Sequence, residues 1–427
     1  MTDASPERPR ILLVAPNISR RMGGEAVKAL RILEGYTALG FDVTQVTHAR
    51  VRQEIAQYRD DLDIVFVEDG PVQVGLFKLR AKWLLSVAGA WLLNREARRQ
   101  VKRKRPWIVH FTSPISPSLP YFPVPGAPVV IGPLNGNLLH PPALLHRESR
   151  SKLIGARLLR PTQFLQRLLF AGKRRAKRLF VSGGARTVTA LEMGGVKRSQ
   201  MIFTLDSGVD AELRDQPRIR HEDINWHFVL VGRLIALKGC DLVIRALRQV
   251  PHARLDVIGD GVERAALEAL ARREDVADRV RFLGYVPAGS ALFEKLSRYR
   301  AFLFPSLREA NGIVVQEAMM KGLPVVALNW GGPAELLDAS TGILLEPQSE
   351  QSIIDGLAEA MKTLAEDPAL ADRLSAAARA RAEERGFDWP SLLRNWIGFY
   401  DDLLAEQGSD RRFGPWLAAR ERASAAE

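Results

Sequence analysis

Short apolar runs alternate along most of the chain with longer stretches in which apolar residues recur at helical spacing. The first run, Ile11–Ala15, is followed by a glycine turn at Gly23-Gly24, a helical stretch over Glu25–Leu39 and a second run, Asp42–Thr47. Runs this short and this apolar predict buried strands. The order strand, helix, strand therefore predicts a right-handed crossover between parallel strands.

The same alternation continues through both halves of the chain. Further strands are predicted at Ile64–Glu68, Trp107–Phe111, Val129–Ile131, Leu179–Ser182 and Met201–Leu205, and then at Phe228–Val231, Leu255–Ile258, Val280–Leu283, Ala301–Phe304 and Val325–Leu328. Between the halves, the run Ala211–Asn225 has many charges and no periodic apolar pattern, which predicts a linker. From Ser352 to about Ala405 the pattern is helical, with a break at Trp389-Pro390.

These patterns predict an α/β fold made of two Rossmann-like, doubly wound domains. The first domain is expected over residues 1–212 and the second over residues 213–388, with a helical tail over residues 389–427. A chain of 427 residues is also long for a single hydrophobic core, which favours two domains.

The stretch Ala301–Glu335 carries two carboxylates in an order that favours a ligand site. Glu309 lies in the turn after one predicted strand, Glu317 lies on the helix that follows, and Gly331-Gly332 follow the next strand. In an open parallel sheet, ligands bind at the carboxyl ends of the strands, where these loops are expected. Small residues in such loops let backbone N–H groups and a helix N-terminus approach a phosphate.

A second loop of the same predicted sheet supplies two cations. Arg233 and Lys238 both follow the strand Phe228–Val231, so they could converge on one diphosphate. Glu317 could then accept hydrogen bonds from a ribose diol, and Glu309 could bind sugar hydroxyls or face positive charge at an anomeric carbon. The alternative is a set of solvated surface charges. Because all of these residues follow strands of one predicted sheet, a ligand site is favoured over surface charges.

Composition is that of a globular protein, with 46% hydrophobic and 26% charged residues. The single cysteine, Cys240, excludes an intrachain disulfide and favours a reducing compartment. The opening MTDASPERPR lacks the apolar segment of a secretory signal. The run Trp83–Leu93 is 11 residues long, whereas a membrane-spanning helix needs roughly 20. We therefore expect a soluble or surface-bound protein.

The net charge of +12 is concentrated in one segment. Residues 71–180 contain 21 Lys and Arg but only two acids, Glu96 and Glu148. Within it, residues 76–105 and 147–178 combine helical apolar spacing with basic side chains, which suits contact with an anionic membrane surface or acceptor. An ordinary amphipathic helix with a solvated basic face explains the apolar spacing equally well. It explains the scarcity of acids less well.

Asp61 and Asp63 match a D-x-D metal pattern, but they precede the predicted strand Ile64–Glu68. This puts both acids at the amino end of the strand, away from the usual ligand edge. A polar turn explains them better, and we predict no metal site.

Four segments together resemble the carboxyl-terminal domain of retaining, family-4-type glycosyltransferases (glycosyl transferases group 1) of the GT-B fold. They are VGRLIALKG, VIGDGVER, RVRFLGYV and FPSLREANGIVVQEAMMKGLPVVALNWGGPAEL. The E-x7-E spacing of Glu309 and Glu317, joined to the R-x4-K spacing of Arg233 and Lys238, is specific in combination. The resemblance is close over residues 226–345 and looser over the whole chain, through ILLVAP, IGPLNG and SGVD.

The resemblance implies two domains that face a central cleft with a nucleotide-sugar donor, and a final helix near Trp389–Leu404 that crosses back to the first domain. It also implies that neither a metal nor another cofactor is required. The catalytic residues expected from it are Glu309, Arg233, Lys238 and Thr112. The donor-binding residues are Gly24, Gly232, Arg233, Lys238, Gly259, Tyr285, Asn311, Gly312, Ile313, Val314 and Glu317, with the two cations on the diphosphate, Glu317 on the ribose and Glu309 on the sugar.

Two departures from the family pattern concern the donor sugar. Many members carry H-x-H after the strand that here reads IVHFTSP, and their second His contacts the sugar. This chain has His110 and then Thr112, so Thr112 is expected in the sugar-facing place and His110 as a packed strand residue. Asn311 stands where an aromatic residue is common in the family, which leaves the donor sugar open.

The sequence thus predicts a retaining hexosyltransferase that uses a nucleoside-diphosphate sugar. The expected acceptor is a membrane-associated glycan or glycolipid of the cell-surface polysaccharide or lipopolysaccharide type. The expected location is the cytoplasm, peripheral on the inner face of the plasma membrane. The alternatives are a GT-B epimerase or synthase with a soluble acceptor, a non-enzymatic binder of anionic polymers, and an inactive scaffold. The donor-site residues argue against nucleic acid as a partner.

Overall fold

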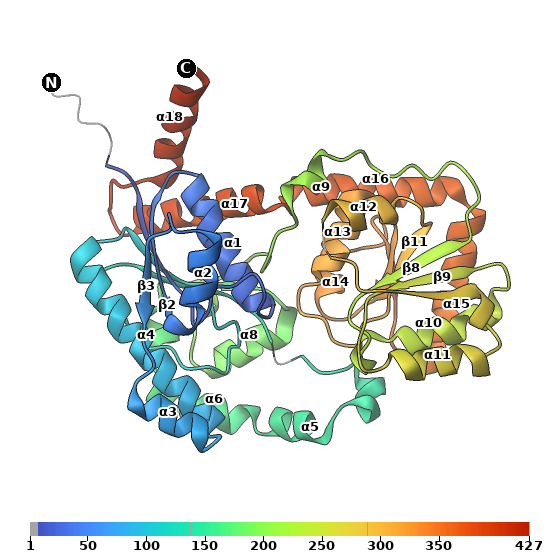
Figure 1. Ribbon diagram of the computed structural model, residues 1–427, viewed down its shortest axis with the longest axis horizontal. Coiled ribbons are helices and arrows are strands. Elements are labelled where there is room, and N and C mark those ends of the chain that lie inside the picture. The colour runs from blue at the N-terminus through green and yellow to red at the C-terminus, as the bar shows by residue number, and fades with distance from the viewer. Residues whose placement is uncertain (1–6, 137, 288, 427) are drawn as a thin grey trace. The chain divides into compact units, whose positions relative to one another are not determined.

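The computed structural model of the chain describes residues 7–136, 138–287 and 289–426, and its elements form two compact α/β units (Figure 1). The first unit comprises Met1–Asn137, Ala156–Asp206 and Pro390–Glu427, and the second comprises Leu138–Gly155 and Ser207–Trp389. The domain boundaries expected at residues 212 and 388 concern domains that fold independently, and they stay a prediction. The sequence did not indicate that residues 138–155 pack with the second unit.

The first unit contains a seven-stranded sheet in the order β3-β2-β1-β4-β5-β6-β7, paired in parallel throughout. The strands are β1 (Arg10–Val14), β2 (Asp42–His48), β3 (Ile64–Val67), β4 (Ile108–Phe111), β5 (Val129–Leu134), β6 (Arg178–Val181) and β7 (Met201–Phe203). The helices are α1 (Gly24–Ala38), α2 (Arg52–Tyr58), α3 (Pro71–Lys78), α4 (Lys82–Lys104), α6 (Leu159–Leu169), α7 (Gly172–Arg175), α8 (Gly184–Met193), α17 (Trp389–Glu406) and α18 (Phe413–Ala426). The short helix α5 (Arg150–Arg157) spans the boundary between the units.

The second unit contains a six-stranded parallel sheet in the order β10-β9-β8-β11-β12-β13. The strands are β8 (His227–Val231), β9 (Arg254–Ile258), β10 (Val280–Gly284), β11 (Ala301–Phe304), β12 (Val325–Leu328) and β13 (Ile343–Leu345). The helices are α9 (Ala211–Asp215), α10 (Cys240–Ala246), α11 (Arg264–Arg273), α12 (Ser290–Leu296), α13 (Ile313–Lys321), α14 (Gly332–Leu336), α15 (Glu350–Glu366) and α16 (Pro368–Glu384).

Both sheets reverse their strand order at their centre, which confirms the doubly wound prediction. The reversal falls between β1 and β4 in the first sheet and between β8 and β11 in the second. At such a point the loops after the two central strands diverge to opposite faces and leave a crevice at the carboxyl edge. Most candidate residues follow these four strands, whereas Gly259 follows β9 and Tyr285 follows β10.

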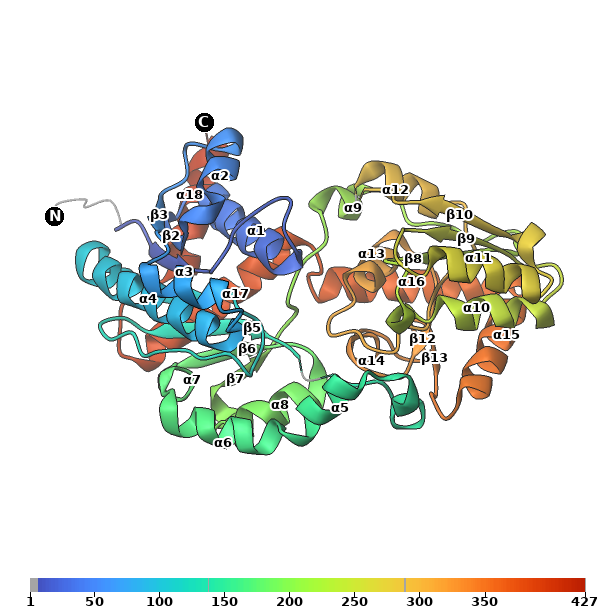
Figure 2. The same ribbon diagram turned by 60° about the horizontal axis from the view of Figure 1, so that its bottom comes forward.

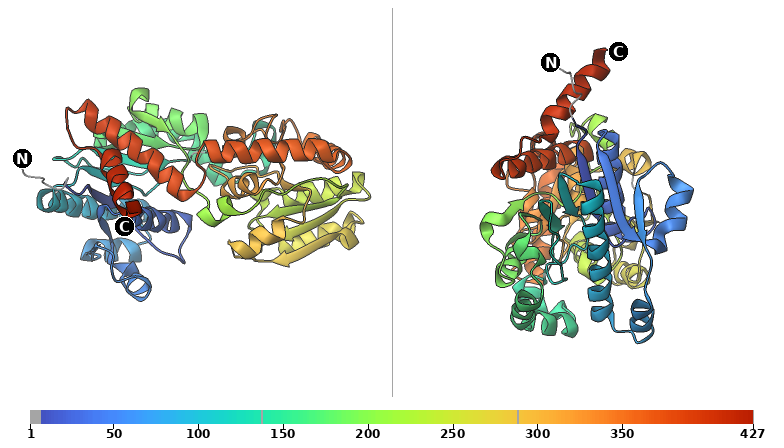
Figure 3. Two further views of the ribbon diagram at one scale, coloured as in Figure 1. Left: turned by 90° about the horizontal axis from the view of Figure 1, so that it is seen from above. Right: turned by 90° about the vertical axis from the view of Figure 1, so that its left-hand side faces the viewer.

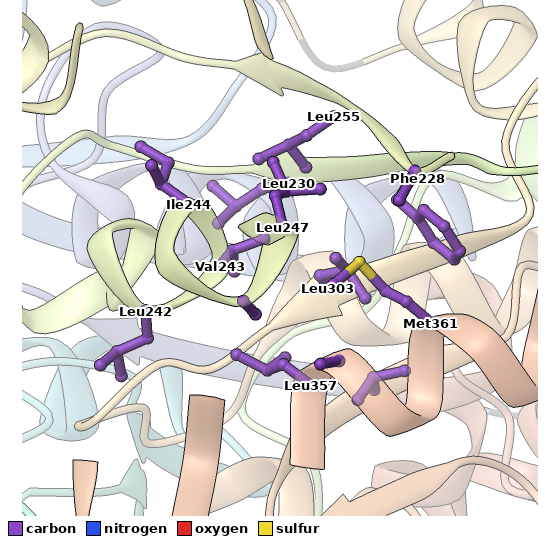
Figure 4. Packing of buried hydrophobic residues seen from close by; sticks show 14 of the residues in the cluster. Phe228, Leu230, Leu242, Val243, Ile244, Leu247, Leu255, Leu303, Leu357 and Met361 are labelled. Carbon is purple, nitrogen blue, oxygen red and sulfur yellow. The ribbon is translucent and has the colours of Figure 1, made fainter. Parts of the chain in front are cut away.

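The core of the second unit explains why its strands read as continuous apolar runs. Phe228, Leu230 and Leu303 are at most 1% exposed and pack against helices α10 and α15 (Figure 4). From those helices come Val243 and Met361, both fully buried. Because helices cover both faces of the sheet, its strands β11 and β12 are fully buried and carry only apolar residues.

The carboxyl-terminal tail belongs to the first unit, and α17 and α18 (red in Figure 3) lie against it. The Tyr400 hydroxyl on α17 lies 2.6 Å from Nδ1 of His110 and 3.0 Å from the Tyr36 hydroxyl, and all three side chains are fully buried. Trp396 donates from Nε1 to the Thr204 hydroxyl at 2.9 Å. A buried hydrogen-bond network of this kind fixes the tail in one position.

Two predictions about local structure were wrong. The expected linker Ala211–Asn225 begins as helix α9 and packs on the second unit, with Leu213 fully buried and Arg218 paired to Asp372 at 2.7 Å. Single apolar residues between charges are enough to anchor this segment. The strand β13 was not predicted, and its three residues are only half-buried.

Candidate functional site

The candidate site of the second unit is built on the central loops of its sheet. Lys238 ends a short 3₁₀ turn in the loop after β8, and Glu309 lies in the loop after β11. Their side chains form an ion pair at the carboxyl edge, where the strand order reverses. The structure thus brings together two residues that lie 71 positions apart in the sequence.

The two cations of the site differ in what they contact. Lys238 is about 16% exposed, and its Nζ lies over the Phe304 ring, 5.0 Å from the ring centre, in addition to its pairing with Glu309. The Arg233 side chain is exposed, and within the described residues it makes no ion pair. An incoming anion could therefore bind Arg233 directly, but it would compete with Glu309 for Lys238.

The amino terminus of α13 lies in the same loop region. Gly312 caps this nine-residue helix with a φ of 76°, a left-handed conformation that favours glycine. Ile313 and Val314 follow as its first residues and are half-buried. The first N–H groups of a helix have no acceptor within the helix, so they are available to an anion.

Glu317 lies one turn further along α13, and its side chain is almost buried. It is 9% exposed and faces a small apolar pocket whose walls include Val231, Leu292, Leu296 and Phe302. Burial, and after it the charge of Asp210, raises the pKa of Glu317 to about 7. A buried carboxyl group with little polar surrounding is suited to accept hydrogen bonds from a bound diol.

The glycines near the site serve the packing of its loops. A Cβ on Gly259 would lie 1.9 Å from the Gly232 carbonyl oxygen, so the end of β9 can approach the end of β8 this closely only with a glycine at 259. Gly331 has a φ of 66°, and a Cβ there would lie 2.4 Å from the Glu309 carbonyl oxygen. Gly332 donates its N–H to that same oxygen at 2.8 Å. Gly331-Gly332 therefore support the Glu309 loop.

Two further predicted residues lie beside these loops. Asn311 is 8% exposed, and its amide donates to the Ser207 hydroxyl at 3.0 Å and accepts from Gln316 at 3.1 Å. Its hydrogen bonds brace the loop from within the protein. Tyr285, directly after β10, is 74% exposed and presents a free ring face at the edge of the sheet.

The arm Leu138–Ser149, which precedes α5, packs on the loops of the candidate site, and the sequence did not predict this. Leu144 is fully buried in the core of the second unit. Trp330 donates to the Leu139 carbonyl at 2.9 Å, directly before the glycines that support Glu309. The signal that could have revealed the arm is Glu148, because it is one of only two acids in a strongly basic segment.

Two ion pairs tie the arm to residues next to the site. Glu148, 4% exposed, pairs with Arg308 at 3.2 Å, one position before Glu309. Arg147 pairs with Asp241 at 2.6 Å, three positions after Lys238. The arm therefore holds both loops whose side chains meet at the carboxyl edge.

Gly24 and Thr112 belong to the first unit, at its own reversal point. Gly24 begins α1 after the β1 loop, and a Cβ there or on Gly23 would meet nothing within 4 Å. No crowding explains this glycine pair, so it leaves open space at a helix N-terminus. Thr112 follows β4 and is fully buried, with its hydroxyl unpartnered among the described residues. His110 is a packed strand residue, as predicted, and burial lowers its pKa to about 3.

The acids of the D-x-D pattern serve the surface of the first unit. Asp63 accepts from the Thr44 hydroxyl at 2.6 Å and from Lys104 at 2.9 Å, while Asp61 pairs with Arg59. Throughout the described part of the chain, no three His, Cys, Asp or Glu side chains are grouped so that they could hold a metal ion. Across the same residues, no helix combines the length and apolar character that a membrane crossing requires.

Solved structures with the same architecture define the fold class. The structure of HepE from Anabaena in complex with UDP superimposes with a TM-score of 0.63 at 19% identity, covering 91% of this chain and 99% of that one. The sucrose-phosphate synthase of Thermosynechococcus elongatus gives a TM-score of 0.61 at 19% identity, covering 93% and 100%. The fold is therefore that of GT-B glycosyltransferases, as predicted.

Sequence comparison matches part of the chain to a known family. Residues 212–381 match the family model "Glycosyl transferases group 1". The glycogen synthase of Mycobacterium tuberculosis H37Rv is 30% identical over 272 residues, which are 57% of this chain and 64% of the relative. The lipopolysaccharide core biosynthesis glycosyltransferase LpsD of Rhizobium meliloti is 32% identical over 42% of this chain and 51% of the relative. The chain thus spans less than two thirds of the length of these relatives.

The raised pKa of Glu317 predicts a pH-dependent stability. The unfolded chain ionises this group near its ordinary value of 4.5, whereas the folded protein holds the proton up to about pH 7. Stability should therefore fall as the pH rises from 4.5 to 7, by about 3 kcal/mol in full. Glu317→Gln should remove most of this fall in urea unfolding measured at pH 5 and pH 8. The matched variant Glu335→Gln, at an exposed carboxyl group, should keep this loss of stability between pH 5 and pH 8. A loss in Glu317→Gln equal to that of the wild type would contradict the assignment of this pH dependence to Glu317.

The ion pair between the arm and the loop predicts that Glu148 and Arg308 contribute jointly to the free energy of unfolding. Arg308→Gln leaves the buried Glu148 carboxylate without its cation, which should cost about 3 kcal/mol or more of stability. The double variant Glu148→Gln/Arg308→Gln should recover part of that loss. The same cycle on the exposed pair Arg248–Glu274 should cost less than about 1 kcal/mol. Equal costs for the two pairs in urea unfolding would show that the arm does not brace the loop.

Proposed function

We propose that the protein is a retaining glycosyltransferase that moves a hexose-type unit from a nucleoside-diphosphate sugar to a membrane-associated glycan or glycolipid. The observation that carries this proposal is the pairing of Lys238 with Glu309 beside the free Arg233 at the reversal point of the second sheet. A catalytic carboxylate and two cations at one strand edge suit a sugar linked to a diphosphate.

The donor is proposed to bind along the carboxyl edge of the second sheet. Arg233 and Lys238 bind the diphosphate, assisted by the N–H groups at the start of α13. Glu317 accepts hydrogen bonds from the ribose diol, which relieves the cost of its burial. The exposed ring of Tyr285 offers a stacking face for the base. The UDP bound to the structurally similar HepE of Anabaena supports a nucleotide at such an edge.

The proposed chemistry is front-face transfer. The bond between the anomeric carbon and the diphosphate oxygen breaks, and its electron pair leaves with the diphosphate, whose charge the two cations stabilise. The acceptor hydroxyl oxygen bonds to the same face of the anomeric carbon, and its proton passes to the departing phosphate oxygen. Once the diphosphate occupies Lys238, the Glu309 carboxylate is free to hold sugar hydroxyls and to face the positive charge that develops on the sugar.

The proposed acceptor is presented by a membrane. α3, the first turns of α4, and α6 lie at the lower end of the first unit in Figure 1, the end that comes forward in Figure 2. Their exposed apolar side chains include Phe77 at 72%, Leu79 at 78% and Leu168 at 65%. Basic residues alternate with them, which suits binding to an anionic lipid surface. A relative from Corynebacterium glutamicum, 33% identical over 36% of this chain, is named as a mannosyltransferase that acts on an acylated phosphatidylinositol mannoside.

A synthase with a soluble acceptor is the second candidate. The similarity to a glycogen synthase and to a sucrose-phosphate synthase favours it. The exposed apolar residues of α3 and α6 have no role in that case, so membrane contact separates the two candidates.

The donor site predicts the effect of removing its paired cation. Nucleoside-diphosphate sugars with uridine, guanosine and adenosine should be tested by thermal shift, and one of them should stabilise the protein by mass action. Lys238→Ala should lower donor turnover on the order of 100-fold, because the departing diphosphate loses a cation. Arg248→Ala, at the opposite edge of the same sheet, should leave turnover unchanged. Wild-type turnover in Lys238→Ala would contradict the assigned role, and no thermal shift with any donor would contradict the transferase.

The membrane proposal predicts flotation with anionic vesicles. The full-length protein should float with phosphatidylglycerol-containing vesicles, and less so at high salt. Phe77→Ser/Leu79→Ser should weaken flotation without loss of thermal stability, because both side chains are exposed. Val262→Ser, 88% exposed in the second unit, should float as the wild type does. Retention on nucleic acid without flotation would favour an anionic-polymer binder.

A further inference from the structure

A cavity of about 210 Å³ lies within the first unit at the carboxyl ends of β1, β2 and β4. Helix α3 contributes Gln73 to it and helix α4 contributes Leu85, Gly89 and Leu93. The cavity is larger than the engineered apolar cavities of about 150 Å³ that bind a benzene ring. It is therefore large enough for part of an organic ligand.

Two side chains at the strand end of this cavity carry a polar atom without a hydrogen-bond partner among the described residues. They are Gln73, only 2% exposed, with its Nε2, and Asn17 with its Oδ1. The other end of the Gln73 amide accepts the Gly70 N–H at 2.7 Å, which fixes its orientation. His48 also lines the cavity, and its Nδ1 lies 3.7 Å from an Asp69 carboxylate oxygen. Buried polar atoms are almost always hydrogen-bonded, so two at one cavity point to a polar group that binds there.

The helical wall of the same cavity is apolar. Leu85, Gly89 and Leu93 recur every fourth residue and face it along about 12 Å of α4. Gly89 leaves room for the polar end, because a Cβ there would lie 3.3 Å from Nε2 of His48. On the same helix, directly before Leu85, Trp83 and Leu84 are 49% and 48% exposed. The apolar wall is thus continuous with the surface that is proposed to contact lipid.

We infer that this cavity binds the acceptor as an amphipathic molecule, with its polar head at Asn17, His48 and Gln73 and the first methylenes of a hydrocarbon chain along α4. The chain leaves the cavity beside Trp83 and Leu84, toward the membrane. This inference rests on the proposed transferase function and names the acceptor class as a sugar or polyol joined to a lipid chain.

The test uses alkyl β-glucosides from methyl to octyl, below the concentration at which micelles form, and isothermal titration of the full-length protein. The dissociation constant should fall about fourfold for each added methylene until the cavity is filled. Ala90→Phe, which fills the cavity from α4, should abolish this dependence. Leu85→Ala enlarges the cavity, so the dissociation constant should go on falling up to a longer alkyl chain than in the wild type. Arg95→Ala, exposed on the same helix and away from both the cavity and the exit of the chain, should behave as the wild type does.

Thermal shifts with UDP, GDP and ADP separate this inference from the proposed function. A nucleotide that stabilises wild type and Ala90→Phe equally shows that both proteins are folded with an intact donor site. Under that condition, binding that does not depend on chain length overturns the inference, as does a chain-length dependence that survives in Ala90→Phe. If no nucleotide stabilises the wild type, the proposed function itself fails.

Discussion

The ion pair between Lys238 and Glu309 is the interaction on which the candidate site of the second unit depends. It joins the loops after the two central strands of the second sheet, where the fold diverges to opposite faces. In the free protein each charge compensates the other in a partly buried place, at 16% and 21% exposure. In the proposed function, a bound diphosphate would take over Lys238 and release Glu309 toward the sugar.

The rest of the second unit supports this pair. Gly331-Gly332 pack on the Glu309 backbone, and the arm Leu138–Ser149 fixes the neighbouring Arg308 and Asp241 through ion pairs. Beside it, Glu317 is held in an apolar pocket at a cost that a bound diol would offset. The site is therefore built from loops that are rigid at the backbone, while its charges are only partly satisfied before a ligand binds.

Much of the fold follows from local pattern. The strands Ala301–Phe304 and Val325–Leu328 have the bounds that their apolar runs predict, because helices cover both faces of the sheet and leave no polar positions. The contact between Lys238 and Glu309 was also predictable, since parallel strands bring their carboxyl ends to one edge. The residue spacing alone could suggest this convergence, but the role of each residue in binding stays a prediction.

Tertiary packing decided the features that the sequence did not reveal. Residues 138–155 carry no sequence pattern that links them to the second unit, and the link rests on buried contacts such as those of Leu144 and Glu148. The glycines at 331 and 332 suggested a phosphate loop, but close contact with the Glu309 loop explains them. The cavity beside α4 is lined by residues of several elements, and no single segment carries a sequence pattern that indicates it.

The most direct measurement is the affinity of Glu309→Gln for the nucleoside diphosphate that stabilises the wild type, determined by titration calorimetry. Because Glu309 competes with the diphosphate for Lys238, the variant should bind this nucleotide several-fold more tightly while it loses sugar transfer. A variant that binds the nucleotide more weakly than the wild type would contradict the competition and, with it, the proposed exchange of partners at Lys238.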